Sequence, residues 1–175
     1  MPCSVAPKFP AISAEPYSFR AMTWSDLPMV RRWLATPAAR KWWGDPAREE
    51  GLLREDMDEP AMSMLIVAHN GEPFAYAQHY AVHTWPQPQF QHLPPGARAI
   101  DTFIGKPTML GRGHGTAFLR VLARHLREHG VPEVAIDPDI TNYRARRAYA
   151  RAGFTREAIV AGAAKRPAVV MLFRD

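Results

Sequence analysis

The chain has 175 residues, of which 47% are hydrophobic, and a formal net charge of +5; this length suits one globular domain with its own core. No stretch approaches the ~20 consecutive apolar residues of a membrane-spanning helix, and the N-terminus shows no signal-peptide pattern, so we expect a cytoplasmic protein without a membrane partner. The single cysteine, Cys3, excludes an internal disulfide and fits a reducing compartment.

The charges are unevenly distributed along the chain. Nine arginines and four acidic residues lie between Gly111 and Arg156, an excess equal to the net charge of the whole chain. Six acidic residues lie between Glu49 and Glu59. The C-terminal half therefore suits an anionic ligand and the 49–59 segment a cationic one, although solvated helix surfaces would give the same pattern.

The N-terminal half is predicted to hold a strand, two helices and a hairpin. Alternating apolar residues indicate strands, and apolar residues at helical spacing indicate helices. Asn70-Gly71 is a strong turn signal between two apolar strands, and Asp45-Pro46 is a helix start. In chain order we predict an unstructured, proline-rich lead-in at 1–16, a strand at 17–23, a helix at 24–35 with N-cap Ser25 and the buried residues Leu27, Val30 and Leu34, a turn-rich connector at 36–46, a helix at 46–58 and a hairpin at 62–83.

The C-terminal half alternates strands and helices after a long, proline-rich loop at 84–96. The helices are expected to end at Gly130 and Gly153, because glycine is the common residue just past a helix. The predicted elements are a strand at 97–105, a helix at 114–129, a strand at 133–138, a helix at 142–152 and strands at 154–160 and 167–173. This pattern predicts an α/β (α+β) fold in one domain, residues 17–175.

The stretch LGRGHGTAFLR, residues 110–120, places Gly111, Gly113 and Gly115 directly before a helix. A helix N-terminus presents unpaired N–H groups and a partial positive charge, and glycines let a phosphate approach them closely. The loop is therefore predicted to hold a pyrophosphate, with Arg112 adding charge; a plain tight connection is the alternative. No Gly-Lys-Ser/Thr follows, so it is not a Walker loop.

Together with a second segment, this loop resembles the GNAT acetyltransferase superfamily, which binds acetyl-CoA. GRGHGTAFL is similar to the family's Gly-x-Gly loop, and NYRARRAYARAGF carries Asn142, Tyr149 and Gly153-Phe154 at the family's spacing. Leu110 departs from the Arg or Gln that such families often place before the glycines. The segments WWG, GEPFAYAQHY, AIDTFIG and AIDPDITN further resemble the aminoglycoside 6'-N-acetyltransferase branch, although siderophore-type acyltransferases share parts of the pattern.

The resemblance implies a GNAT fold, in which a mixed, mostly antiparallel twisted sheet has a splayed parallel strand pair and helices on both faces. It also implies transfer of an acetyl group from acetyl-CoA to a primary amine of a small cationic acceptor, with the 6'-amine of an aminoglycoside as the acceptor that the branch suggests. Attack would be direct, in a ternary complex, with backbone N–H groups of residues 102–104 polarising the thioester carbonyl.

Two residues would carry the chemistry. Asp101 stands mid-strand, where aspartate is disfavoured, and its counterpart in the family contacts the reacting amine. A free carboxylate is a weak base for an ammonium group, so we expect Asp101 to orient the amine and to pass its proton through water, with a pKa that burial could raise. Tyr149 would protonate the departing thiolate. A buried structural aspartate and an ordinary core tyrosine are the alternatives.

The remaining site residues follow from the same resemblance. Phe103, Ile104, Leu110, Gly111, Arg112, Gly113, His114, Gly115, Thr116, Asn142 and Arg147 are expected to bind the cofactor, although Asn142 could also be a plain N-cap. Trp42, Trp43, Tyr76, Gln78, Asp101 and Asp137 are expected to bind the acceptor. Core or wall packing is the alternative for the aromatic residues, and a turn before Pro138 is the alternative for Asp137.

Other functions stay open at this level. An acetyltransferase acting on a siderophore precursor, a polyamine or a peptide amine would carry the same motifs, as would an acetyl-CoA-binding sensor without turnover. A nucleic-acid partner is not expected, because no groove-reading motif accompanies the arginines, and the histidines show no metal-ligand spacing. The loop at 84–96 is expected to shape the acceptor pocket, and the oligomeric state, monomer or homodimer, is not fixed by the sequence.

Overall fold

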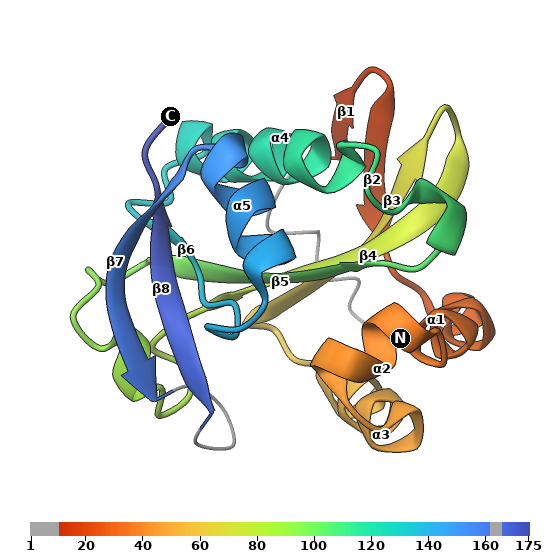
Figure 1. Ribbon diagram of the computed structural model, residues 1–175, viewed down its shortest axis with the longest axis horizontal. Coiled ribbons are helices and arrows are strands. Elements are labelled where there is room, and N and C mark those ends of the chain that lie inside the picture. The colour runs from red at the N-terminus through yellow and green to blue at the C-terminus, as the bar shows by residue number, and fades with distance from the viewer. Residues whose placement is uncertain (1–10, 162–165) are drawn as a thin grey trace, which may run out of the picture.

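A computed structural model describes residues 11–161 and 166–175, which form an eight-stranded mixed sheet with helices on both faces (Figure 1). Within these residues the strands are β1 (Ile12–Ala14), β2 (Tyr17–Ala21), β3 (Met62–His69), β4 (Glu72–Ala81), β5 (Arg98–Ile104), β6 (Val134–Ile136), β7 (Phe154–Ala161) and β8 (Pro167–Phe173), in the spatial order β1-β2-β3-β4-β5-β6-β8-β7. The α-helices are α1 (Leu27–Leu34), α2 (Pro37–Trp43), α3 (Pro46–Asp56), α4 (His114–Glu128) and α5 (Tyr143–Ala152).

The sheet opens at its centre. β5 and β6 are parallel, whereas the other paired strands of the sheet are antiparallel. The β5–β6 ladder consists of two residue pairs, Arg98 with Val134 and Ala99 with Ala135. Beyond Ala99 the two strands separate, and α5 lies beside the opening (Figure 1). The predicted splayed parallel pair is therefore present.

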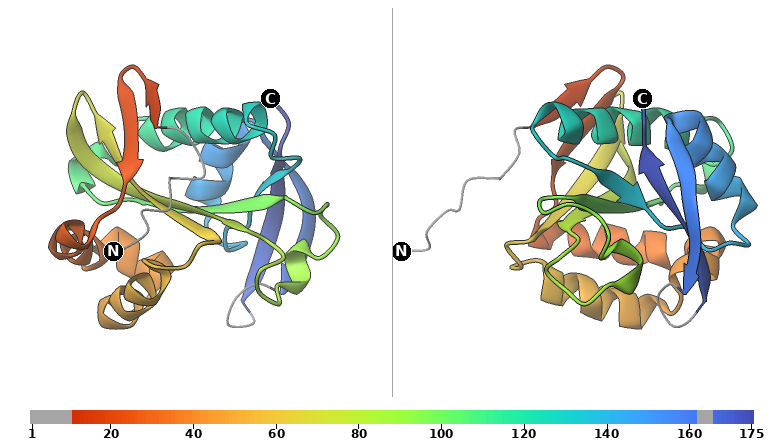
Figure 2. Two further views of the ribbon diagram at one scale, coloured as in Figure 1. Left: turned by 180° about the vertical axis from the view of Figure 1, so that it is seen from behind. Right: turned by 90° about the vertical axis from the view of Figure 1, so that its left-hand side faces the viewer.

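Two helical layers cover opposite faces of the sheet, with α4 and α5 on one face and α1, α2 and α3 on the other (Figure 2). Beyond the irregularity in the β3–β4 pairing at Phe74, side chains on β4 alternate between the layers, as a pleated strand requires. Ala75 and Ala77 belong to the core beneath α4, and Tyr76 belongs to the core beneath α1–α3. Because side chains alternate, Tyr76 and Gln78 lie on the same face of β4, the face covered by α1–α3.

The loop at 84–96 covers the α1–α3 face of the sheet at its other end. It contains the short 3₁₀ turn η2 (Pro88–Phe90). Phe90 and Leu93 are buried in a third apolar cluster with Tyr80 and Ala99. These contacts fix the loop against the sheet next to the strand opening.

Most predicted elements are confirmed, including the hairpin around Asn70-Gly71 and the helices ahead of Gly130 and Gly153. The prediction of a connector at 36–46 is wrong over α2. Thr36 caps that helix by accepting a hydrogen bond from Ala39 N (3.4 Å), and Pro37 occupies its first position. A cap followed by proline is a helix-start signal, so the sequence held the information.

Two corrections concern the N-terminal part. The helix predicted from residue 24 begins at Leu27, after the 3₁₀ turn η1 (Trp24–Asp26), and Asp26 rather than Ser25 is its N-cap residue. Within the predicted lead-in, β1 pairs with β2 and buries Ile12; residues 1–10 lie outside the described part of the chain.

Candidate active site

Three of the predicted functional side chains meet at the strand opening. Asp101 lies on β5, two residues beyond the last β5–β6 pair, and Asp137 directly follows β6. Tyr149 lies on α5. Burial raises the pKa of Tyr149, and the charges of Asp101 and Asp137 raise it further. Like an ordinary tyrosine, Tyr149 is therefore protonated at neutral pH and can act as a proton donor.

Asp101 is held by a chain of hydrogen bonds that starts inside the protein. Gln78 on β4 lies opposite Asp101 in the strand register, and its Nε2 donates to Asp101 Oδ2 at 2.9 Å. The hydroxyl of Tyr76 donates to Gln78 Oε1 at 2.6 Å. Tyr76 has 0% exposure and Gln78 has 7%, so neither offers much surface to an acceptor, and both were expected there.

Burial raises the pKa of both carboxylates. The pKa of Asp101 rises to about 6, mainly through burial; the Gln78 hydrogen bond lowers it and the charge of Asp56 raises it. The pKa of Asp137 rises to about 7 through burial and the charge of Asp101, against a hydrogen bond from Gln89 Nε2 at 3.2 Å. A carboxylate whose pKa lies near the working pH is a better proton acceptor than a free one.

Helix α3 adds further negative charge to the same side of the cleft. Glu49 and Asp56 lie on α3 and are partly buried. Burial raises the pKa of both groups, and the charge of Asp101 is a further cause for Glu49. Two acids of the 49–59 segment, Glu49 and Asp56, thus interact electrostatically with Asp101, and negative charge of this kind favours a ligand with several positive charges.

The opposite side of the opening is built from backbone. Gly113 is the N-cap of α4 and has φ of +85°, and Gly111 has φ of +74°. Both values belong to the left-handed region that favours glycine. Among residues 11–161 and 166–175 no side chain caps α4, so within this part of the chain the N–H groups of residues 114–116 remain available to an anion.

The side chains of His114 and Thr116 are engaged elsewhere. Tyr17 Oη lies 2.8 Å from His114 Nδ1, and Thr116 Oγ1 donates to the carbonyl of Ala148 on α5 at 3.1 Å. These two predicted cofactor-site residues therefore offer backbone N–H groups to a ligand. Gly115 lies between them in the first turn of α4.

The arginine beside the glycine loop is not the one expected. Arg144 Nη2 lies 3.6 Å from the position that a Cβ on Gly111 would occupy. Arg147 instead lines a groove of about 640 Å³ between α5 and β7–β8, with Arg146 and Arg156. The signal for Arg144 was its place in the first turn of α5, two residues after Asn142. Leu110 and Arg112 lie in the loop, where Leu110 is partly buried and Arg112 is exposed.

Asn142 is the N-cap of α5, since its Oδ1 accepts from Ala145 N at 3.1 Å. The N-cap interpretation of this residue is therefore confirmed. Its amide nitrogen donates no hydrogen bond within the described residues and can serve a ligand.

Successive N–H groups along β5 point alternately toward β4 and toward β6, and this alternation determines which of them face the opening. Arg98 N donates toward β6, to the carbonyl of Glu133, and Gly105 N donates toward β4, to the carbonyl of Phe74. Because successive N–H groups of a strand point to opposite sides, those of Thr102 and Ile104 share the β6 side, where the ladder has ended. The N–H group of Phe103 points toward β4.

Aromatic residues pack beside the hydrogen-bond chain that holds Asp101. The Trp43 ring lies 4.8 Å from that of Phe103 and 5.9 Å from that of Tyr76. Trp42, also partly buried, has the Lys41 ammonium 4.9 Å from its ring. Trp43 therefore borders the buried hydrogen-bond chain, whereas the Trp42 ring stacks with a lysine.

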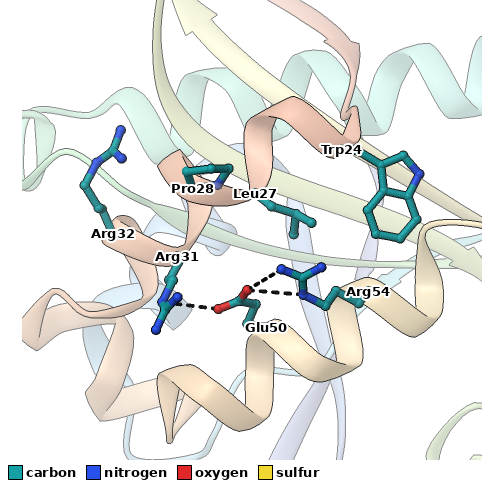
Figure 3. A pocket seen from close by; sticks show the side chains of 7 residues that line it. All are labelled: Trp24, Leu27, Pro28, Arg31, Arg32, Glu50 and Arg54. Carbon is teal, nitrogen blue, oxygen red and sulfur yellow. Dashed lines mark hydrogen bonds and ion pairs between the residues drawn. The ribbon is translucent and has the colours of Figure 1, made fainter.

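A second groove, of about 550 Å³, lies between α1 and α3 (Figure 3). On its floor Glu50 forms ion pairs with Arg31 (3.3 Å) and Arg54 (2.8 Å). This arrangement joins α1 to α3 and so supports the helix that carries Glu49 and Asp56.

Residues 11–161 and 166–175 contain neither a cluster of metal-ligating side chains nor a membrane-spanning helix. No group of three or more His, Cys, Asp or Glu residues there could hold a metal ion. In the same residues, no helix has the length and apolar character needed to cross a membrane.

Comparison with known proteins agrees with this geometry. Residues 23–161 match the family described as acetyltransferase (GNAT) domain. The aminoglycoside N(6')-acetyltransferase type 1 of Klebsiella pneumoniae is 33% identical over 160 residues, which cover 85% of this chain and 78% of that protein. A kanamycin resistance protein of Rhizobium radiobacter is 39% identical over 67 residues, 38% of this chain and 62% of that protein.

Solved structures give the same result. The structure of AAC(6')-Ib with paromomycin and acetyl-CoA has a TM-score of 0.78 and 31% identity, covering 91% of this chain and 93% of that chain. The structure of the same enzyme with coenzyme A and kanamycin has a TM-score of 0.77 and 32% identity, covering 89% and 93%. The chain belongs to the GNAT acetyltransferase family, and it is an N-acetyltransferase.

Proposed function

We propose that this GNAT acetyltransferase transfers the acetyl group of acetyl-CoA to the 6'-amine of an aminoglycoside. The observation that carries the proposal is the pair Asp101 and Asp137 at the strand opening, with the acids of α3 on one side and the uncapped start of α4 on the other. An aminoglycoside carries several ammonium groups, which suits the acidic side. The 33% identical relative from K. pneumoniae, named for this reaction, supports the choice of acceptor.

The donor side suits a pyrophosphate. The N–H groups of residues 114–116 and the positive end of α4 would hold the phosphates. Arg144 and Arg112 add positive charge at the loop. Asn142 would offer its amide nitrogen to the pantetheine arm, which leads from the phosphates into the strand opening.

The reaction needs three contributions from the chain. Asp101 orients the acceptor amine and takes up its proton, directly or through water, so that the nitrogen lone pair is free to attack. The N–H groups of Thr102 and Ile104 stabilise negative charge on the thioester oxygen as the new N–C bond forms. When the C–S bond breaks, Tyr149 donates its proton to the thiolate of CoA.

Asp137 has a different place in this scheme. Its carboxylate lies across the opening from β5 and interacts with the charge of Asp101. A second ammonium group of the acceptor would neutralise this charge, so Asp137 serves to bind the acceptor.

The test is CoA release measured with a thiol reagent. Kanamycin A and tobramycin carry a 6'-amine, whereas paromomycin carries a 6'-hydroxyl on a closely related scaffold. We expect turnover with the first two and none with paromomycin, and loss of turnover in Asp101→Asn and Tyr149→Phe. Acetyl-CoA binding without turnover of any 6'-amino acceptor would contradict the proposed acceptor.

A further inference from the structure

The hydrogen bonds behind Asp101 form a directed chain. The Tyr76 hydroxyl, Gln78 and Asp101 are joined at 2.6 Å and 2.9 Å. Tyr76 and Gln78 are two residues apart on β4 and therefore lie on the same face of the strand. Tyr76 is also fixed by packing, because its ring lies 5.9 Å from Trp43 and 5.5 Å from Phe103.

The chain permits a single orientation of the Gln78 amide when Asp101 is ionised. A carboxylate only accepts hydrogen bonds, so the –NH₂ end of the amide must face it. The carbonyl end then faces Tyr76, whose hydroxyl donates to it. If the amide were reversed, its oxygen would face a carboxylate oxygen, a contact that only a protonated Asp101 could satisfy.

The second carboxylate has no such support. Gln89, which donates to Asp137 at 3.2 Å, comes from the loop at 84–96. Within the described residues no hydrogen bond holds the other end of the Gln89 amide. The two carboxylates thus have the same type of donor, but only that of Asp101 is fixed from within the core.

We propose that Tyr76 and Gln78 are positioning residues for the reaction: Tyr76 fixes the amide of Gln78, and the amide holds Asp101 ionised with Oδ2 occupied and Oδ1 turned to the acceptor amine. This role goes beyond lining the acceptor pocket. Its value for catalysis rests on the proposed function, whereas the effect on Asp101 itself does not.

Several groups act on the same carboxyl group. Asp137 faces it from the end of β6, Asp56 and Glu49 from α3, Tyr149 from α5, and Tyr76 and Tyr80 from β4. The three carboxylates and the one phenol on the other elements, Asp137, Asp56, Glu49 and Tyr149, are untouched by a change at Gln78. A change of the Asp101 titration midpoint in a Gln78 variant is therefore due to the loss of the hydrogen bond from the Gln78 amide.

The experiment is an NMR titration of the protein labelled with ¹³C at the aspartate carboxyl carbon. Asp101→Asn identifies the Asp101 resonance, and an Asp137→Asn background separates it from the coupled pair. Gln78→Met keeps the shape of the side chain and removes the donor. We expect the titration midpoint of Asp101 to rise by roughly one pH unit, as for the loss of one hydrogen bond to a charged group.

Two further variants separate positioning from packing. Tyr76→Phe frees the amide to rotate, and we expect a smaller rise of the midpoint. Gln78→Met leaves the Tyr76 hydroxyl buried without a partner, which lowers thermal stability; the double variant Tyr76→Phe/Gln78→Met removes both partners. We expect the double variant to regain thermal stability while its Asp101 midpoint stays raised.

Tyr80→Phe is the matched control, because it removes a hydroxyl from the same face of β4 that donates to Gln87 and not to Gln78. We expect no change of the Asp101 midpoint in this control. An unchanged Asp101 midpoint in Gln78→Met would overturn the proposal. The proposal would also fail if the Asp101 midpoint of the double variant returned to the wild-type value when its thermal stability was regained. Failure of aminoglycoside turnover would refute the proposed acceptor and leave the titration result standing.

Discussion

The two sides of the strand opening differ in the groups that they offer: backbone N–H groups on one side and side chains on the other. On the proposed donor side, the phosphates would contact backbone N–H groups of one short segment, residues 114–116 at the start of α4, with Arg112, Arg144 and Asn142 beside it. The proposed acceptor side consists of side chains from β4, β5, the end of β6, α3 and the loop at 84–96. A site made of backbone tolerates most substitutions except at its glycines, whereas a site made of carboxylates changes with each of them.

The largest expected effect tests the acceptor side. Asp101→Asn keeps the shape of the side chain and removes the charge and the basic oxygen, so we expect kcat/KM for the acceptor to fall by about 10² to 10⁴. Acetyl-CoA affinity, measured by calorimetry, should change little because the donor side is elsewhere. A large loss of acetyl-CoA affinity in this variant would mean that the two sides are not independent.

The next effect tests the glycines of the donor side. Gly113→Ala forces a Cβ into a left-handed conformation, which costs about 1–2 kcal/mol, and we expect acetyl-CoA binding to weaken about tenfold. Gly115 is the internal control, because it lacks a positive φ and a Cβ there would lie 3.7 Å from Ile104 Cδ1, an ordinary contact.

Gly115→Ala should therefore leave thermal stability unchanged or raised. If it also weakens acetyl-CoA binding, close approach of the phosphate is the reason for that glycine. Equal loss of stability in both alanine variants would contradict the assigned roles.

The third prediction concerns how stability depends on pH, because some carboxyl groups have a raised pKa in the folded protein and others have a lowered pKa. The pKa of Asp101 is raised to about 6 and that of Asp137 to about 7, so the folded state binds protons more tightly than the unfolded state. Stability from these groups is therefore present at low pH and is lost as the pH rises from about 4 to about 7. We expect Asp137→Asn to raise the melting temperature at about pH 8 and to have little effect at about pH 4.

Asp26 is the opposite case. The pKa of its carboxyl is lowered to about 2, first by the hydrogen bonds from Arg20, so its stabilisation is present above about pH 4 and is lost as the pH falls through 2. We expect Asp26→Asn to lower the free energy of unfolding by about 2 kcal/mol at neutral pH. Denaturant unfolding at several pH values would refute both assignments if the two variants changed stability in the same direction at neutral pH.

The smallest expected effect tests which arginine contributes to acetyl-CoA binding on the donor side. Arg144 lies at Gly111 and Arg147 lines the other groove. We expect Arg144→Ala to weaken acetyl-CoA binding about threefold to tenfold, as for an exposed charge near a phosphate, and Arg147→Ala to leave it nearly unchanged. Equal effects of the two variants would show that the ligand also reaches the groove between α5 and β7–β8.

Most of the secondary-structure elements, and the glycine loop before α4, could be predicted from local sequence signals. The positive φ values of Gly111 and Gly113 and the start of α4 lie within a few residues of each other, and the hairpin at Asn70-Gly71 is equally local. The same holds for the N-cap of α5 at Asn142, whose partner Ala145 is three residues away. Local signals of this kind also included Thr36-Pro37, whose helix α2 was missed although a cap and a proline marked its start.

Only the tertiary structure decided how the acceptor side is assembled. The hydrogen bond from Gln78 to Asp101 spans 23 residues, and that from Gln89 to Asp137 spans 48. The placement of Arg144 at Gly111, and the side of β5 on which the N–H groups of Thr102 and Ile104 lie, likewise depend on how α5 and β6 pack. The physical reason is that a carboxylate's pKa and a side chain's partner depend on burial and on neighbours distant in sequence, which local patterns do not encode.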